Sequence, residues 1–403
     1  MEHPDRADHP SLQLPFGCHI TERETTFRLY APEARAVECL IYPGFHADTP
    51  RVWPMERTEA GVWHLTLPEN LTGHWYQYRM SWPEGKSPDT PYSSQPFADP
   101  WSHYVAVHDT YRQEARSYIF QDDFDWEDDS FIQIHDQRDL IICEAHIKDL
   151  VAHPSSGARG ESTYQKWLDL DQRGGLPYLK RLGVNAVEFL PLQKFPFREP
   201  PWREETVEGF HNTWNPYAAN HWGYMTSFFM APETRYATAS KGLSQTTEDS
   251  VGEQVVRAAR DLKRIINTLH ANGIAVIMDI VFNHTSLFDI NPLGHHLKGT
   301  FLRRDEHGVA MNRSGTGNEM RTEHPVVRKL ILDTLTWWMT EYHVDGFRFD
   351  LAGLIDERSW DPILERIRQI NPGAPVIAEP WGGRYVPWLF SNHGWSSWND
   401  RFR

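Results

Sequence analysis

The chain has 403 residues, enough for two or three domains, and its 55 acidic against 40 basic residues give a formal net charge of -15 at pH 7. This negative balance argues against nucleic acid or an anionic membrane as a partner. Three cysteines without metal or redox spacing indicate a reducing compartment and no disulfide framework. The polar start MEHPDRADHP lacks the apolar core of a signal peptide, and no stretch is apolar enough to cross a bilayer, so we expect a cytoplasmic protein.

The N-terminal part of the chain has the pattern of a β-sandwich. Residues 1–12 are polar and are expected to be a disordered lead. Alternating apolar runs such as TTFRLY and HWYQYRMS, separated by Pro, Gly and Asn turns, then predict an all-β, immunoglobulin-like sandwich over 13–108. We expect this sandwich to have its own core and to fold alone. Its tryptophans either form a sugar platform or, as is commoner for alternating aromatics, belong to the core: Trp53, Trp63, Trp75 and Trp82.

An acidic, irregular segment over 109–136 is expected to be a linker, and from residue 137 the pattern changes to strands alternating with helices. About five such units predict a parallel sheet with right-handed crossovers. We expect 137–403 to form the N-terminal part of a (β/α)8 TIM barrel, incomplete after about five β/α units. An open doubly wound sheet has similar spacing, but no Gly-rich phosphate turn follows the first strand.

Two carboxylates end separate apolar strands of this predicted sheet. In VDGFRFD, alternation places Arg348 and Asp350 on the same side of the strand, where the guanidinium keeps the carboxylate ionised, as a nucleophile requires. Glu379 follows the apolar run 375–378, where desolvation raises the pKa of a carboxyl group, as a general acid requires. Two such carboxyl groups are the minimum needed to cleave a glycosidic bond with retention of the anomeric configuration. The alternative for Arg348 and Asp350 is a structural ion pair at a strand end.

A third strand carries polar residues of its own. The apolar run 274–281 is interrupted by Asp279, and Asn283 and His284 follow where the strand opens into a loop. These side chains could hydrogen-bond sugar hydroxyls. The alternative is an Asp satisfied by neighbouring backbone and a His that caps the loop. A metal site is disfavoured because no spaced ligand cluster accompanies them, so we expect neither a metal nor an organic cofactor.

The segments DIVFNHT, GFRFDLAG and VIAEPWG resemble the conserved regions of the alpha-amylase superfamily, glycoside hydrolase family 13. Within it, EPW and GWSSWNDRFR are similar to the pullulanase and isoamylase types of glycogen- and starch-debranching enzymes. The stretches 316–351 and HWGYMTSFFMAPETRYAT resemble type I pullulanases. The predicted sandwich resembles the family 48 carbohydrate-binding module that precedes the barrel in debranching and branching enzymes.

The resemblance implies roles residue by residue. Asp350 would be the nucleophile, Glu379 the acid/base and Arg348 the residue that orients the nucleophile. The residues that would bind the sugar are Asp279, Asn283, His284, Tyr224 and Trp381. The family also has a His-Asp pair on a later strand, for which the 403 residues contain no match. We therefore expect these residues by themselves to be inactive.

The sequence thus predicts a retaining hydrolase that acts on α-1,6 branch linkages of α-glucans such as glycogen, starch or pullulan. A branching enzyme, another transglycosylase or an α-1,4 amylase of the same superfamily is the nearest alternative. A catalytically inactive glucan-binding fragment is an alternative from a different class. The expected partner is an α-glucan, with no nucleic acid and no membrane.

Overall fold

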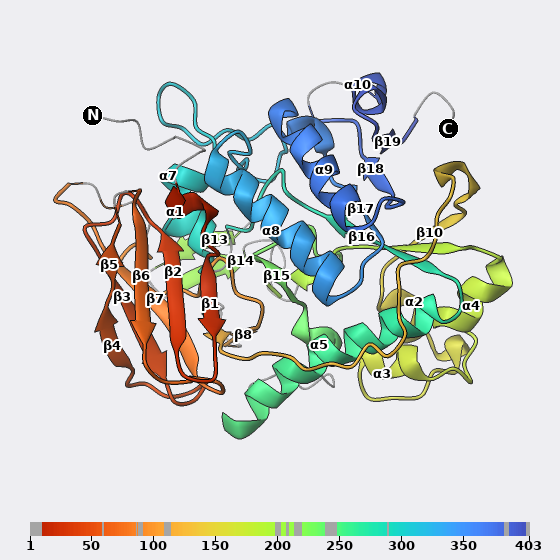
Figure 1. Ribbon diagram of the computed structural model, residues 1–403, viewed down its shortest axis with the longest axis horizontal. Coiled ribbons are helices and arrows are strands. Elements are labelled where there is room, and N and C mark those ends of the chain that lie inside the picture. Colours follow the sequence, from red (N-terminus) through yellow and green to blue (C-terminus); the bar gives the residue numbers. More distant parts are fainter. Residues whose placement is uncertain are drawn as a thin grey trace.

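Two folded parts lie side by side in the computed structural model, a β-sandwich and a helix-covered parallel sheet (Figure 1). The structure describes residues 10–399, with gaps at 59, 86, 88–91, 109–113, 198–202, 207–208, 213–219, 238–247, 288–289 and 383–386. Among the helices that it describes, none combines the length and apolar composition of a membrane span.

The sandwich is built from two antiparallel sheets, which confirms the predicted all-β pattern. The first has the order β1-β2-β6-β5 and the second the order β4-β3-β7-β9-β8. Their strands are β1 (Gly17–Ile20), β2 (Thr25–Tyr30), β3 (Ala36–Tyr42), β4 (Arg51–Pro54), β5 (Glu56–Arg57), β6 (Val62–Leu67), β7 (Trp75–Ser81), β8 (Val105–Val107) and β9 (Ala115–Tyr118).

The aromatic residues of the sandwich mostly fill its core. Trp63 and Trp75 are only 5% and 2% exposed, so for them the core role is confirmed. Trp53 is exposed and Trp82 is half-buried. A continuous sugar platform of all four rings is therefore excluded, because two of the rings lie inside the sandwich.

Two details differ from the sequence prediction at the ends of the sandwich. β9 lies within the segment predicted as a linker and pairs with β7 on one side and β8 on the other. Its sequence, ARSY, is too polar and too short to be recognised as a strand. At the other end, α1 (Pro10–Gln13) forms in the predicted disordered lead and buries Leu12; residues 1–9 lie outside the described residues.

The sandwich shares a hydrophobic core with the rest of the chain. The indole of Trp101 donates a hydrogen bond to Asp333 of α8 (Pro325–Glu341) at 3.0 Å. The ring of Phe97 stacks on His296, with centroids 4.2 Å apart. The hydrophobic core of the sandwich is thus continuous with that of the second part, and β9, which follows residue 108, belongs to its second sheet. The independent folding of residues 13–108 stays a prediction.

The second part contains a six-stranded parallel sheet of order β10-β11-β16-β17-β18-β19. The sequence predicted about five strands and missed the last, which has two residues. The sheet curls but its two edge strands, β10 and β19, are not paired with each other among the described residues. The strands are β10 (Ile142–Ala145), β11 (Ala186–Phe189), β16 (Ala275–Ile280), β17 (Gly346–Phe349), β18 (Val376–Ala378) and β19 (Ser396–Ser397).

Helices follow most of these strands, as the alternating pattern predicts. α8 begins at Pro325, where the His324 side chain accepts a hydrogen bond from the Val326 amide, and its apolar residues recur at helical spacing on the buried side. The helices are α2 (Asp149–Ala152), α3 (Thr163–Leu168), α4 (Gly175–Leu182), α5 (Glu248–His270), α6 (Pro292–His295), α7 (Lys298–Phe301), α8, α9 (Trp360–Ile370) and α10 (Pro387–Asn392). The segment after β11 carries two two-stranded antiparallel sheets, and the segment after β16 carries helices α6 and α7. The strands of the two small sheets are β12 (Gln193–Lys194) with β15 (Phe228–Pro232) and β13 (Arg203–Thr206) with β14 (Gly209–Asn212).

The end of α5 is anchored by a buried ionic network. His270 Nε2 lies 2.8 Å from Asp345 Oδ2, and His270 Nδ1 lies 3.0 Å from Asp129 Oδ1. The other carboxylate oxygen of Asp345 accepts a hydrogen bond from the Ile132 amide at 2.8 Å. The network therefore ties the segment after the sandwich to the end of α5 and to the amino end of β17.

We expect this network to make the stability of the protein pH-dependent. Burial disfavours the charged imidazole, but Asp345 and Asp129 outweigh it and raise the pKa of His270 above 6.5. Because the folded-state pKa is the higher one, the stabilisation is fully present below about pH 6.5 and is lost as the pH rises through the raised value. His270→Gln should cost about 1.5–3 kcal/mol at low pH and less at high pH. Thermal melts between pH 6 and 9 test this, and an equal loss at every pH would contradict it.

Candidate active site

The predicted site residues lie at the carboxyl ends of three neighbouring strands. In the parallel register Asp279 on β16 stands beside Arg348 on β17, and Arg348 stands beside Ile377 on β18. Asp350 directly follows β17 and Glu379 directly follows β18. Since carboxyl ends of parallel strands meet at one edge, side chains separated by about a hundred residues in the sequence converge there.

Arg348 contacts all three acidic residues predicted for the site. One terminal nitrogen, Nη1, lies 2.8 Å from Asp279 Oδ1 and 3.0 Å from Asp350 Oδ1. The other, Nη2, lies 3.0 Å from Glu379 Oε1. The residue is 3% exposed, so these attractions act where water screens them little. A single guanidinium, which does not lose its proton in proteins, thus contacts three carboxylates.

Asp350 is held on both carboxylate oxygens. Arg348 contacts Oδ1, and the Asn283 side-chain amide donates to Oδ2 at 2.7 Å and to the Asp350 carbonyl at 2.9 Å. The next residue, Leu351, has φ 38° and ψ 49°, a left-handed conformation that is strained for a branched side chain. This turn ends the strand abruptly and leaves the Asp350 carboxylate at its tip.

Glu379 has the surroundings of a proton donor. Burial raises the pKa of its carboxyl group, although Arg348 acts in the opposite direction. The Leu351 amide donates a hydrogen bond to Oε2 at 2.7 Å, so the same turn that follows Asp350 also orients Glu379. Glu379 is buried, as the apolar run before it predicts, and its role as the acid stays a prediction.

Asp279, Tyr224 and His284 form a chain of contacts beside the two carboxylates. The Tyr224 hydroxyl donates to Asp279 Oδ2 at 2.5 Å, and burial raises the pKa of Asp279 well above its usual range. His284 lies with Nε2 2.6 Å from the Tyr224 carbonyl and Nδ1 2.5 Å from Asn283 Oδ1. The polar atoms of Asp279 and His284 are thus largely engaged by protein groups. The partners of Asp279 are the side chains of Tyr224 and Arg348 and not the neighbouring backbone, whereas His284 contacts a backbone carbonyl.

Two aromatic rings border the site. Trp381 follows β18, and its ring lies 5.8 Å from that of Trp398 in an edge-on arrangement. The Trp398 ring in turn faces the Arg348 guanidinium at 4.5 Å, within the range of a cation–π contact. The structure therefore brings together all eight residues predicted for the site, Trp381 indirectly through Trp398.

Sequence reasoning missed Trp398 and Glu188. Glu188 lies in the middle of β11, is 3% exposed, and its pKa is raised by burial to about 7. The signal was present, because a Glu inside the apolar run AVEF is as unusual as Asp279 inside its own strand. Trp398 had no comparable local signal, since its contact with Arg348 joins distant parts of the chain.

A β-sandwich is followed by a curled parallel sheet that gathers three acidic side chains on one arginine at its strand ends, where α/β barrel proteins place their functional groups. Comparison with known proteins shows which families the chain resembles. Residues 15–102 match carbohydrate-binding module 48, the isoamylase N-terminal domain. The chain is 32% identical to the chloroplastic isoamylase 3 of Oryza sativa subsp. japonica, over 97% of this chain and 52% of the relative.

Pullulanases are similar both in sequence and in structure. The Bacillus subtilis pullulanase is 30% identical, over 91% of this chain and 46% of its own length. The crystal structure of the Paenibacillus barengoltzii pullulanase with maltohexaose and alpha-cyclodextrin superposes with a TM-score of 0.75 at 28% identity, over 93% of this chain and 55% of that one. The chain thus spans about half the length of the relatives it matches. The resemblance to debranching enzymes of the alpha-amylase superfamily with an N-terminal module 48 is confirmed.

Proposed function

We propose that the protein containing this chain is a retaining glycoside hydrolase that cleaves α-1,6 branch linkages in α-glucans. The observation that carries the proposal is the placement of Asp350 and Glu379 on the two terminal nitrogens of Arg348. Retention needs two carboxyl groups that flank the same bond in different protonation states. The raised pKa of Glu379 and the ion pair and amide contacts of Asp350 support that division of roles.

In the first step, a carboxylate oxygen of Asp350 attacks the anomeric carbon of the sugar. The bond to the leaving oxygen breaks, and Glu379 transfers its proton to that oxygen. The product is a glycosyl ester on Asp350. In the second step, Glu379 takes a proton from water, the hydroxide attacks the anomeric carbon, and Asp350 is released as a carboxylate. Each cycle therefore returns both groups to their starting protonation states.

The neighbouring side chains have positioning roles in this proposal. Arg348 and Asn283 hold Asp350 at the strand end. Tyr224 presents its ring beside Asp279, and its edge-on neighbour Trp222, 6.5 Å away between centroids, is largely exposed. An exposed aromatic surface of this kind suits the apolar faces of sugar rings. Asp279, His284 and Trp381 are proposed to contact the sugar at the same edge of the sheet.

The preference for α-1,6 linkages gives a direct test. EPW at 379–381 and the stretch from Gly394 are similar to the debranching group, and several relatives are named isoamylase, pullulanase or glycogen debranching enzyme. We expect the full-length protein to hydrolyse pullulan or glycogen faster than linear amylose. Reducing-end release and product analysis on both substrates decide this. A clear preference for amylose would move the protein to the α-1,4 amylases.

Transfer to another sugar is the second candidate, because the same two carboxylates serve when a sugar hydroxyl takes the place of water in the second step. New branched products in the same assay, in place of reducing ends, would favour it. We propose that residues 1–403 by themselves are inactive, since both edges of the sheet are unpaired among the residues that the structure describes and the sequence has no match to the family's later His-Asp pair. We propose an α-glucan as the partner and the cytoplasm as the compartment, which the three free cysteines support.

A further inference from the structure

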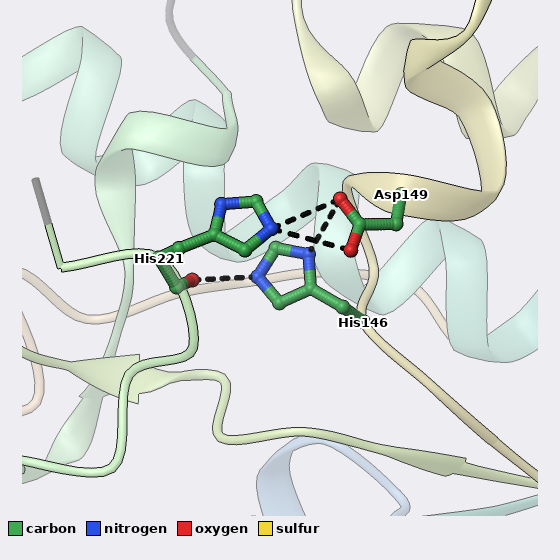
Figure 2. A group of neighbouring side chains, drawn as sticks. All are labelled: His146, Asp149 and His221. Carbon is green, nitrogen blue, oxygen red and sulfur yellow. Dashed lines mark hydrogen bonds and ion pairs between the residues drawn. The ribbon is translucent and has the colours of Figure 1, made fainter.

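A second cluster of polar side chains lies outside the proposed catalytic residues, at the carboxyl end of edge strand β10. His146 directly follows β10, Asp149 is the first residue of α2, and His221 belongs to the segment that leads to Tyr224. Figure 2 shows the two imidazoles and the carboxylate facing one another. Two of these residues come from one turn and the third from a segment 72 or more residues later.

The three inward-facing atoms have the spacing of metal ligands. Asp149 Oδ1 lies 3.0 Å from His221 Nε2 and 3.6 Å from His146 Nδ1. All three ligand atoms lie within 4.8 Å of one another. A tetrahedral ion with bonds of about 2.1 Å holds its ligands about 3.4 Å apart. The two imidazoles are stacked, with centroids 4.3 Å apart and planes inclined by 24°, so the exposed His221 ring has to turn for both lone pairs to point at such an ion.

The orientation of His146 is fixed by contacts on its far side. Its Nε2 lies 2.8 Å from the His221 carbonyl and 3.1 Å from the Tyr236 hydroxyl, and the residue is 6% exposed. An N–H donated from Nε2 to a carbonyl leaves the lone pair on Nδ1, which is how protein metal sites orient their histidines. The Lys148 amide also points at Nδ1, at 3.2 Å. Metal binding would replace this long hydrogen bond.

We propose that His146, Asp149 and His221 form a binding site for a divalent transition-metal ion, Zn²⁺ in particular. Two imidazoles and one carboxylate suit this class of ion, whereas Ca²⁺ prefers six to eight oxygen ligands and Mg²⁺ keeps several waters. Three protein ligands leave one tetrahedral position for water or a ligand oxygen. His221 and Asp149 are exposed, so an ion can enter from solvent.

The consequence of binding is a link between two segments. The ion would join the end of β10 and the start of α2 to the segment 220–224, whose last residue donates to Asp279. The exposed Trp222 lies between His221 and Tyr224, so its position is set by the same segment. The metal would therefore stabilise the side of the sugar-binding edge formed by Trp222 and Tyr224, without touching Asp350 or Glu379. The proposal does not depend on the linkage that the enzyme cleaves.

The test uses the natural full-length protein after treatment with a chelator. Isothermal titration should show one tight Zn²⁺ site, and Co²⁺ at the same site should give the strong visible absorption of tetrahedral coordination. His221→Asn should weaken Zn²⁺ binding by at least the ~100-fold that loss of an outer-shell partner can cause. Zn²⁺ should also raise the melting temperature of the wild type and not that of the variant.

Controls separate this site from adventitious surface binding. His307→Asn removes a histidine that is exposed and paired only loosely with Glu306, and it should leave the Zn²⁺ titration unchanged. Asp149→Asn removes a second exposed ligand and remains informative if the buried His146 cannot be replaced without unfolding. Equal Zn²⁺ affinity in the wild type and in both His221→Asn and Asp149→Asn would overturn the proposal. Binding of Ca²⁺ but not Zn²⁺ would overturn it as well.

Discussion

Asp350→Asn in the full-length protein is expected to lower glucan hydrolysis by about 10⁴-fold or more, which corresponds to ~5.5 kcal/mol of barrier. The amide is nearly isosteric with the carboxylate and can still accept a hydrogen bond from Arg348. It is not a nucleophile of comparable strength, so the glycosyl ester does not form. The measurement is the initial rate of reducing-end release from pullulan.

The control for this substitution is Asp171→Asn, because Asp171 is an exposed carboxylate whose partner is the exposed Arg159. Its rate should equal that of the wild type. Equal binding of maltooligosaccharide by Asp350→Asn and the wild type would show that the variant is folded. A turnover of Asp350→Asn close to that of the wild type would refute the assignment of the nucleophile.

Glu379→Gln is expected to produce a loss that depends on the leaving group. With a glucan, whose leaving oxygen must be protonated, the rate should fall by about 10²–10⁴-fold. With a glycosyl fluoride or an activated aryl glycoside the first step needs little protonation and should be much less affected. The glutamine oxygen can still accept the hydrogen bond from the Leu351 amide, while its NH2 group loses the contact with Arg348.

The pH dependence of kcat/KM tests the role of Glu379 independently. Since burial raises the pKa of Glu379, its protonated form persists to higher pH than that of an exposed Glu. The alkaline limb of kcat/KM in the wild type should therefore report the loss of this proton, and the limb should disappear in Glu379→Gln. Glu365→Gln, at an exposed position on α9, is the matched control. An equal loss on all substrates would show that Glu379 is not the acid.

The proximity of the proposed site residues was predictable because they carry strong local signals. Asp350 and Glu379 each end an apolar strand in a charge, and Asp279 interrupts one. Parallel strands bring such ends to one edge whatever the loops between them do, so the residues meet without further information. Helices α5 and α8 were equally predictable from the sequence, since their apolar residues repeat at helical spacing over many turns.

What the sequence did not predict depends on contacts between distant residues. β9 is a strand because β7 and β8 provide partners on both sides of it, although ARSY itself is polar. β19 has two residues and exists only as an addition to β18. His146 and His221 are 75 residues apart and meet through a loop whose path no periodicity encodes. Each of these features is decided by tertiary packing, which local patterns do not contain.

The contacts of Arg348 influence how many of the neighbouring carboxyl groups are protonated. One positive charge cannot neutralise Asp279, Asp350 and Glu379 together, and Glu188 adds a further acidic group nearby. Burial raises the pKa of Asp279, Glu188 and Glu379, which lowers the cost of keeping protons on them near neutrality. We therefore expect some of these carboxyl groups to be protonated in the resting site. Under the proposed mechanism, Glu379 would donate a proton that the site already holds, before any exchange with bulk water.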